Sequence, residues 1–130
     1  MAQGINPADL KAPFGAFSHA AWAPAGRTLY ISGQVATDTE GKVVGEGDIS
    51  AQTEQTLRNI GAILRNVGGT FDDIVSVTVF VAEMSGLAAI HEVRRRFFKP
   101  PYPASTLVEI KSLVDARLLI EINAVAVIAS

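Results

Sequence analysis

The sequence predicts an α+β fold: a two-layer sandwich in which one mixed β-sheet of five to six strands is covered on one face by two helices. Segments with apolar residues at every second position predict the strands, and two segments with apolar residues at spacings of three and four predict the helices. Their order along the chain is strands, helix, strand, helix, two strands. A length of 130 residues, with 48% hydrophobic and 18% charged residues, indicates one domain, residues 1–130, with one core.

The N-terminal part of the chain is predicted to hold short strands and turns. The first 26 residues are rich in Gly, Ala and Pro, which disfavours a regular helix and favours short edge strands. The apolar pattern of residues 27–36 predicts a strand that is interrupted by the polar run Ser32-Gly33-Gln34. Several glycines within residues 38–47 predict a turn or hairpin.

The first predicted helix follows this turn. It begins after a cap at Asp48 or Ser50 and runs to about Val67, and Gly68-Gly69 ends it. Apolar residues recur along it at spacings of three and four, as expected for a helix with one buried face.

The second predicted helix begins after a cap at Ser85 and runs to about Phe98, where Lys99-Pro100-Pro101 stops it. Its sheet-facing residues are Ile90, Val93 and Phe97. A neighbouring stripe of the same helix contains Leu87, His91, Arg94 and Phe98.

Three further strands are predicted, and the two helices leave one face of their sheet uncovered. Residues 74–81 alternate strictly and are substantially apolar on both faces, which predicts an interior strand. Residues 105–110 and 117–128 follow, joined by a short polar link around Asp115. We expect the uncovered face to be buried against other copies of the chain, and a closed cyclic oligomer is the economical arrangement.

Charge and composition disfavour several classes of partner and site. A net charge of -2 provides no field that would draw the chain toward phosphate backbones, so we expect no nucleic-acid partner. With no cysteine there is no disulfide, thiolate metal site or cysteine nucleophile, which is compatible with a reducing cytosol.

The N-terminus has no signal-peptide pattern and no apolar run reaches about 18 residues, so we expect a soluble cytoplasmic protein without membrane contact. The sequence also lacks a phosphate-binding loop and a metal-ligand cluster, so neither a cofactor nor a metal is expected.

Two carboxylates are candidates for chemistry. Glu121 lies between two isoleucines in the most apolar strand. It is either a structural glutamate bonded to backbone or to a neighbouring subunit, or a general acid or base whose pKa is set by that environment. Glu109 shares a strand face with Ser105 and Leu107, and we expect it in water near the strand end or paired with a lysine.

Other polar residues are weaker candidates. Ser32 and Gly33 offer a hydroxyl and an unobstructed backbone amide, which suit a small anionic or carbonyl ligand but are also common in plain strands. His91 lies one position beyond the core stripe of its helix, where a surface or interface role is the more common one. The three arginines at 94–96 point in different directions on a helix, which favours a solvated surface over an RNA-binding patch.

Short motifs are spread along nearly the whole chain. They are Gly15-Ala16-Phe17-Ser18-His19, Ile31-Ser32-Gly33-Gln34, Gln55-Thr56-Leu57-Arg58-Asn59-Ile60, Val77-Thr78-Val79-Phe80-Val81, Phe97-Phe98, Pro103-Ala104 with Thr106, Val108-Glu109 and Ile120-Glu121-Ile122. Each motif is weak alone, but in this order they are specific. Together they resemble the reactive intermediate deaminase family, also called Rid or YjgF-like, in which the first motif has the form Gly-Pro-Tyr-Ser-Gln.

This resemblance implies a chorismate-mutase-like fold and a homotrimer whose sheets form an inner barrel with three clefts between subunits. In family members with deaminase activity, an imine formed from an enamine is hydrolysed to a ketone and ammonia, without a metal or an organic cofactor. By resemblance, Glu121 matches the glutamate that orients or activates the attacking water, and Ser32 with the Gly33 amide lines the cleft. The other implied substrate-binding positions are Phe17, His91, Ser105, Thr106 and Leu107.

Four of these positions depart from the family pattern. Phe17 replaces a tyrosine, His91 occupies a position where asparagine is frequent, and Leu107 replaces a cysteine or threonine. Ser105 stands where the family has an arginine that binds the substrate carboxylate. The loss of a charged two-bond contact costs about 1.5–3 kcal/mol, or about ten- to hundredfold in binding. We therefore expect an arginine-lacking branch of the family, which acts on an imine, enamine or related labile small molecule with altered specificity.

Two other functions and one question stay open. The lost polar groups also fit a trimeric small-molecule-binding or regulatory protein that has no chemistry of its own. Ribonuclease activity or translation inhibition has been attached to this family, but the net charge of -2 and the lack of an aromatic and basic surface argue against it. Carboxylate binding would be restored if Arg94, Arg117 or an arginine of another subunit reached the cleft.

Overall fold

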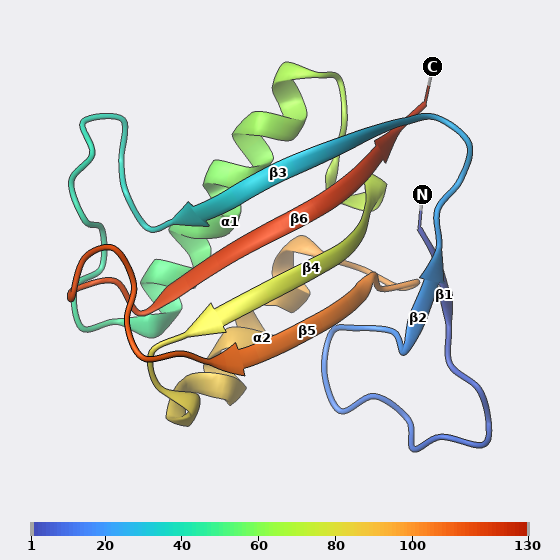
Figure 1. The fold of residues 1–130 in the computed structure, drawn as a ribbon, viewed down its shortest axis with the longest axis horizontal. Helices are drawn as coiled ribbons and strands as arrows, with labels where there is room; N and C mark the ends of the chain where they lie inside the picture. Colours follow the sequence, from blue (N-terminus) through green and yellow to red (C-terminus); the bar gives the residue numbers. More distant parts are fainter. Residues whose placement is uncertain (1, 130) are drawn as a thin grey trace.

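A computed structural model describes residues 2–129 of the chain, and its helices and strands follow the predicted order. Figure 1 shows this arrangement. The elements are β1 (Gln3–Ile5), β2 (Ala20–Trp22), β3 (Arg27–Val35), α1 (Ile49–Asn66), β4 (Ile74–Val81), α2 (Leu87–Phe97), β5 (Ala104–Glu109) and β6 (Ile120–Ile128), with short 3-10 turns at Phe71–Asp73 and Met84–Gly86.

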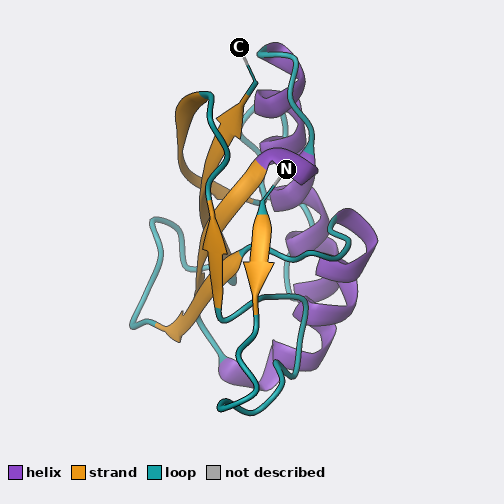
Figure 2. Cartoon of the chain, turned by 90° about the vertical axis from the view of Figure 1, so that its right-hand side faces the viewer, coloured by secondary structure: helices purple, strands orange, loops and turns teal. Residues whose placement is uncertain are grey.

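The main sheet has four strands in the order β3-β6-β4-β5. Strands β4 and β5 are parallel, and the other neighbours are antiparallel. Both helices pack on one face of this sheet, which gives the two layers seen in Figure 2. The predicted α+β sandwich with one mixed sheet and two helices is therefore confirmed.

The predicted number of strands in this sheet needs a correction. Strands β1 and β2 pair with each other in a separate two-stranded sheet, so six strands are divided into four and two. Each of these strands is only three residues long. Between them, Ser18 forms a single bridge to Ala104 of the main sheet, too short a pairing to add a strand.

Helix α1 has the ends that the sequence predicts. The Asp48 carboxylate accepts a hydrogen bond from the Ala51 amide at 3.0 Å, which caps the first turn. Gly68 follows the helix with a φ of +76°, a left-handed conformation that favours glycine. The local signals in the sequence were sufficient here because both caps are formed by neighbouring residues.

The start of α2 differs from the prediction. Ser85 lies in the 3-10 turn, and the helix begins at Leu87 after Gly86, without a side-chain cap. The amide of Met84 donates instead to the Glu109 carboxylate, at 2.8 Å. A residue of β5 thus replaces the local cap, and Glu109 has an exposed structural role without a lysine partner among the described residues.

Strand β6 starts three residues later than predicted because the segment before it bonds to α1. The buried side chain of Gln52 donates to the Arg117 carbonyl and accepts from the Leu119 amide, both at 2.8 Å. Arg117 itself is held by Asp115, whose carboxylate accepts from Nη2 at 2.7 Å and from Nε at 3.0 Å. These contacts hold residues 117–119 against α1 before the strand begins, while the Leu119 carbonyl still accepts from the Ala82 amide at 3.0 Å.

The core lies between the helices and the sheet. Its largest fully buried apolar side chains are Leu57, Ile60, Leu64, Ile74, Val79, Val81, Ile90, Val93, Ile120 and Ile122. In the part of the chain that the structure describes, neither helix is long and apolar enough to cross a membrane.

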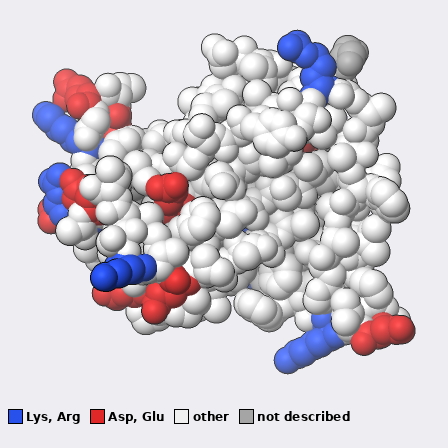
Figure 3. Space-filling model, in the orientation of Figure 1, with Lys and Arg blue, Asp and Glu red and all other residues white. Residues whose placement is uncertain are grey.

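The other face of the sheet is open. Register places Tyr30, Val125 and Phe80 on it, and the Tyr30 side chain is 79% exposed. Figure 3 views the molecule from this side: charged side chains gather mainly over the loops at its ends, and a broad uncharged area covers the middle and right of the view. Such a surface is suited to contact with another protein surface.

Candidate functional site

A cavity of about 200 Å³ lies between α2, β5 and the loop that precedes β2. Four of the residues predicted to bind substrate line it: Phe17, His91, Ser105 and Leu107. The rest of its wall consists of Phe14, Met84, Leu87 and Arg94.

Strand β5 positions two of these residues because its side chains alternate between the faces of the sheet. Ser105 and Leu107 are paired in register with Val77 and Val79, whose buried side chains face the helices. Ser105 and Leu107 therefore point toward α2. Thr106 lies on the opposite, open face, where it pairs with Thr78, so it does not line the cavity.

The loop contributes two aromatic rings to the cavity wall. The rings of Phe14 and Phe17 meet edge to face, with centroids 5.2 Å apart, and they lie 5.5 Å and 6.2 Å from the His91 ring. Gly15 allows this approach, since a Cβ there would be 2.5 Å from His91 ring atoms. The wall around the polar groups is thus mainly apolar, and two phenylalanine rings form part of it.

His91 is buried, with 6% of its surface exposed, although the sequence favoured a surface or interface position. Its Nδ1 atom is buried and has no hydrogen-bond partner among the described residues. Burial, followed by the positive charges of Arg94 and Arg95, lowers the pKa of His91 to about 4. The imidazole is therefore uncharged at neutral pH.

This pKa predicts how stability depends on pH. The unfolded chain binds a proton at His91 near pH 6.5 but the folded chain only near pH 4, so stability should fall as pH decreases through this window. The slope from one proton is about 1.4 kcal/mol per pH unit at most. Urea unfolding of the wild type and of His91→Asn at several pH values, at equal protein concentration, measures this pH dependence of the free energy of unfolding. The variant should lack the part that His91 contributes, and the same pH dependence in both proteins would contradict the assignment.

Arg94 shows the largest departure from the sequence-based expectation. The prediction of a solvated surface is correct for Arg95 and Arg96 but wrong for Arg94, which is 1% exposed. Arg94 lies one turn after His91 and faces β5, and the loop before β2 covers it. Its Nη2 donates to the Ser105 hydroxyl at 3.1 Å and to the Ala16 carbonyl at 3.3 Å. Sequence reasoning placed Arg94 and His91 in one helical stripe but had no signal for the covering loop.

The charge state of Arg94 follows from its burial. Burial lowers the pKa of its guanidinium to about 10, so the group stays protonated at neutral pH. Its Nη1 atom is buried and bonds to no partner among residues 2–129. Arg117, the other arginine considered from the sequence, bonds to Asp115 and does not line the cavity.

Glu121 lies on the open face of the sheet, away from this cavity. It pairs in register with Val35 of β3 and Phe80 of β4. A bulge in β3 contains Ser32 and Gly33, and it places Gly33 beside Glu121: any side chain at Gly33 would collide with the Glu121 carboxylate. No donor within the described part of the chain hydrogen-bonds to this carboxylate, so it is available to a water molecule or a ligand.

The predicted site residues thus form two groups. The cavity group, defined as Phe17, His91, Arg94, Ser105 and Leu107, faces the helices. The glutamate group, defined as Ser32, Gly33 and Glu121, lies across the sheet from it. One chain does not bring the two groups together.

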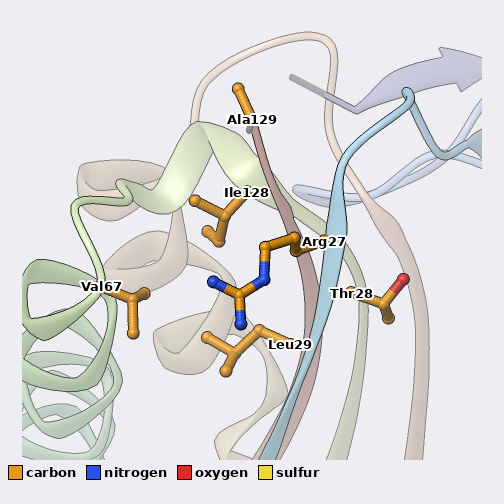
Figure 4. Close-up of a pocket in the computed structure, with 6 residues that line it drawn as sticks. All are labelled: Arg27, Thr28, Leu29, Val67, Ile128 and Ala129. Atoms are coloured by element: carbon orange, nitrogen blue, oxygen red, sulfur yellow. The ribbon is translucent and has the colours of Figure 1, made fainter.

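Other features of the surface do not involve these residues. A cavity of about 300 Å³ lies between the end of α1 and the ends of β3 and β6 (Figure 4), and the exposed Arg27 is its one charged residue. Across residues 2–129, no three His, Asp or Glu side chains are grouped so that they could hold a metal ion.

Comparison with known proteins identifies the family. The profile of the Endoribonuclease L-PSP family matches residues 9–128. The chain is 39% identical to a RutC family protein of Pyrococcus horikoshii, over 97% of this chain and 98% of the relative. It is 31% identical to the human 2-iminobutanoate/2-iminopropanoate deaminase, over 95% and 88% of the two chains.

Solved structures of similar proteins indicate the same family. A crystal structure of a Rid-family protein from Yersinia pestis superimposes with a TM-score of 0.90 at 36% identity, covering 98% of both chains. RidA from an Antarctic Psychrobacter species gives a TM-score of 0.73 at 32% identity, covering 97% and 99%. The profile, the sequence identities and the superpositions cover nearly the same residues, and the chain therefore belongs to the Endoribonuclease L-PSP family, which is also the YjgF or Rid family.

Proposed function

We propose that the protein hydrolyses an imine, or an enamine that has tautomerised to an imine, to a carbonyl compound and ammonia. The observation that carries this proposal is the Glu121 carboxylate, which lies against Gly33 and has no donor among the described residues. A carboxylate in this position is suited to hold and deprotonate a water molecule. The human relative is a 2-iminobutanoate/2-iminopropanoate deaminase, which supports the same reaction class here.

The chemistry needs only the carboxylate and water. The water oxygen bonds to the carbon of a protonated imine, the C=N electron pair moves to nitrogen, and Glu121 takes a water proton. Glu121 then returns this proton to nitrogen, and the carbon–nitrogen bond breaks. The hydroxyl proton leaves with ammonia as ammonium, so a carbonyl product forms and the carboxylate is regenerated.

The complete site is proposed to form between subunits of a homotrimer. In one chain the glutamate group and the cavity group lie on opposite faces of the sheet. A closed ring in which the open face of each copy meets the cavity of the next would join them and would cover the exposed Tyr30. The broad uncharged area of this face supports such a contact.

Ammonia release from a panel of imines and enamines, generated in situ, tests the proposed function. The purified protein is expected to accelerate ammonia release from at least one member of the panel above the rate in buffer. A panel that contains imines with and without a carboxylate separates the chemistry from the recognition. Rates equal to the buffer rate for every member would overturn the proposal.

A further inference from the structure

The cavity contains a positive charge that no described residue neutralises with an ion pair. Arg94 is 1% exposed, yet none of the ion pairs formed by residues 2–129 includes it. A buried guanidinium normally pairs with an anion, because its desolvation is costly. The structure therefore provides a cation without the matching anion.

The hydrogen bonds of Arg94 show where an anion would bind. Nη2 is occupied by the Ser105 hydroxyl and the Ala16 carbonyl, whereas Nη1 has no partner among the described residues. Ser105 Oγ accepts the bond from Arg94, so its own proton is available to a ligand. Arg94 and Ser105 originate from different elements, and both residues line the one cavity.

The remaining lining limits the ligand. His91 is uncharged at neutral pH and adds no second cation. Phe14, Phe17 and Leu107 make the rest of the wall largely apolar. A volume of about 200 Å³ has room for about seven water-sized groups, so the ligand is small.

We infer that Arg94 is an anion-binding residue, and that with the Ser105 hydroxyl it holds the carboxylate of a small ligand with a short apolar chain. The Arg94 guanidinium belongs to α2, whereas in the family pattern the arginine is on the strand, at the position of Ser105. This inference rests on the proposed function in one respect: the carboxylate belongs to the imine that is hydrolysed. It replaces the expectation that loss of the strand arginine weakens carboxylate binding.

A product analogue pair tests the inference without any turnover. The probes are 2-oxobutanoate and its neutral amide, 2-oxobutanamide, which have nearly the same shape but differ in charge. Calorimetric titration of the assembled wild-type protein should give binding of the acid that is about ten- to hundredfold tighter than that of the amide. Equal affinities for the acid and the amide would overturn the inference.

Three variants assign the effect to Arg94. Arg94→Met should remove the preference for the acid, and Arg94→Lys, which keeps the charge, should retain part of it. Arg95→Met is the matched control, since Arg95 is the exposed neighbour on the same helix, and should retain the full preference. Full preference in a folded Arg94→Met protein would contradict the inference.

If Arg94→Met does not fold, the wild-type and Arg94→Lys titrations still decide, because Arg94→Lys must then show a weaker preference than Arg95→Met. The result is independent of imine hydrolysis. Preference for the acid in a protein that releases no ammonia would leave the binding site standing and remove the proposed function. Imine turnover without any preference for the acid would support the proposed function and overturn the anion-binding role of Arg94.

Discussion

Replacement of Glu121 by glutamine is expected to lower imine turnover by about 10²- to 10⁴-fold, the usual contribution of a positioned general base. The amide keeps the size of the side chain and its contact with Gly33 but cannot accept the proton of the attacking water. Steady-state ammonia release with the best substrate of the panel measures the effect. Binding of 2-oxobutanoate should change much less, because the cavity group is intact in this variant.

Glu109→Gln is the matched control. It makes the same chemical change in a carboxylate that is exposed and bonded to the Met84 amide. This variant should keep turnover within about twofold of the wild type, since the amide oxygen still accepts the backbone bond. Wild-type turnover in Glu121→Gln would show that another group activates the water and would remove the proposed role of Glu121.

Two inactive variants are expected to regain activity when they form one trimer. Glu121→Gln disables the glutamate group, and Leu107→Trp fills the cavity with a larger side chain. If each site combines the glutamate group of one copy with the cavity of the next, mixed trimers contain some sites with both parts intact. Random mixing of equal amounts should then restore about a quarter of wild-type activity.

The mixing experiment needs evidence of subunit exchange and one control. After joint unfolding and refolding, native mass spectrometry should show mixed trimers near three times the 13.7 kDa chain mass. A mixture of Glu121→Gln with Glu121→Ala damages the same half of every site and should stay inactive. If native mass spectrometry confirms mixed trimers of Glu121→Gln and Leu107→Trp and these trimers are inactive, a site built from two copies is contradicted.

Local sequence signals predicted much of the fold. The Asp48 cap, the glycine that ends α1 and the alternation of β4 were sufficient because each depends on residues close in the chain. Predictions were wrong where a distant residue took the place of a local partner. Glu109 bonds the turn before α2, and Gln52 bonds the segment before β6.

For the candidate site, side-chain chemistry was visible in the sequence but its arrangement was not. The family resemblance indicated Glu121, Ser32 and Gly33 as candidate site residues, and strand alternation was enough to place Ser105 and Leu107 on one face. The burial of Arg94 could not be predicted, because it depends on a loop almost 80 residues away that packs over the helix.

Sequence alone was thus enough to establish the α+β class and the family, since these are properties of residue order. The three-dimensional structure was needed to show that a guanidinium from α2 lies 3.1 Å from the Ser105 hydroxyl. It was also needed to show that Glu121 lies on the other side of the sheet. Both findings concern contacts between distant segments, which only the packing of helices, strands and loops determines.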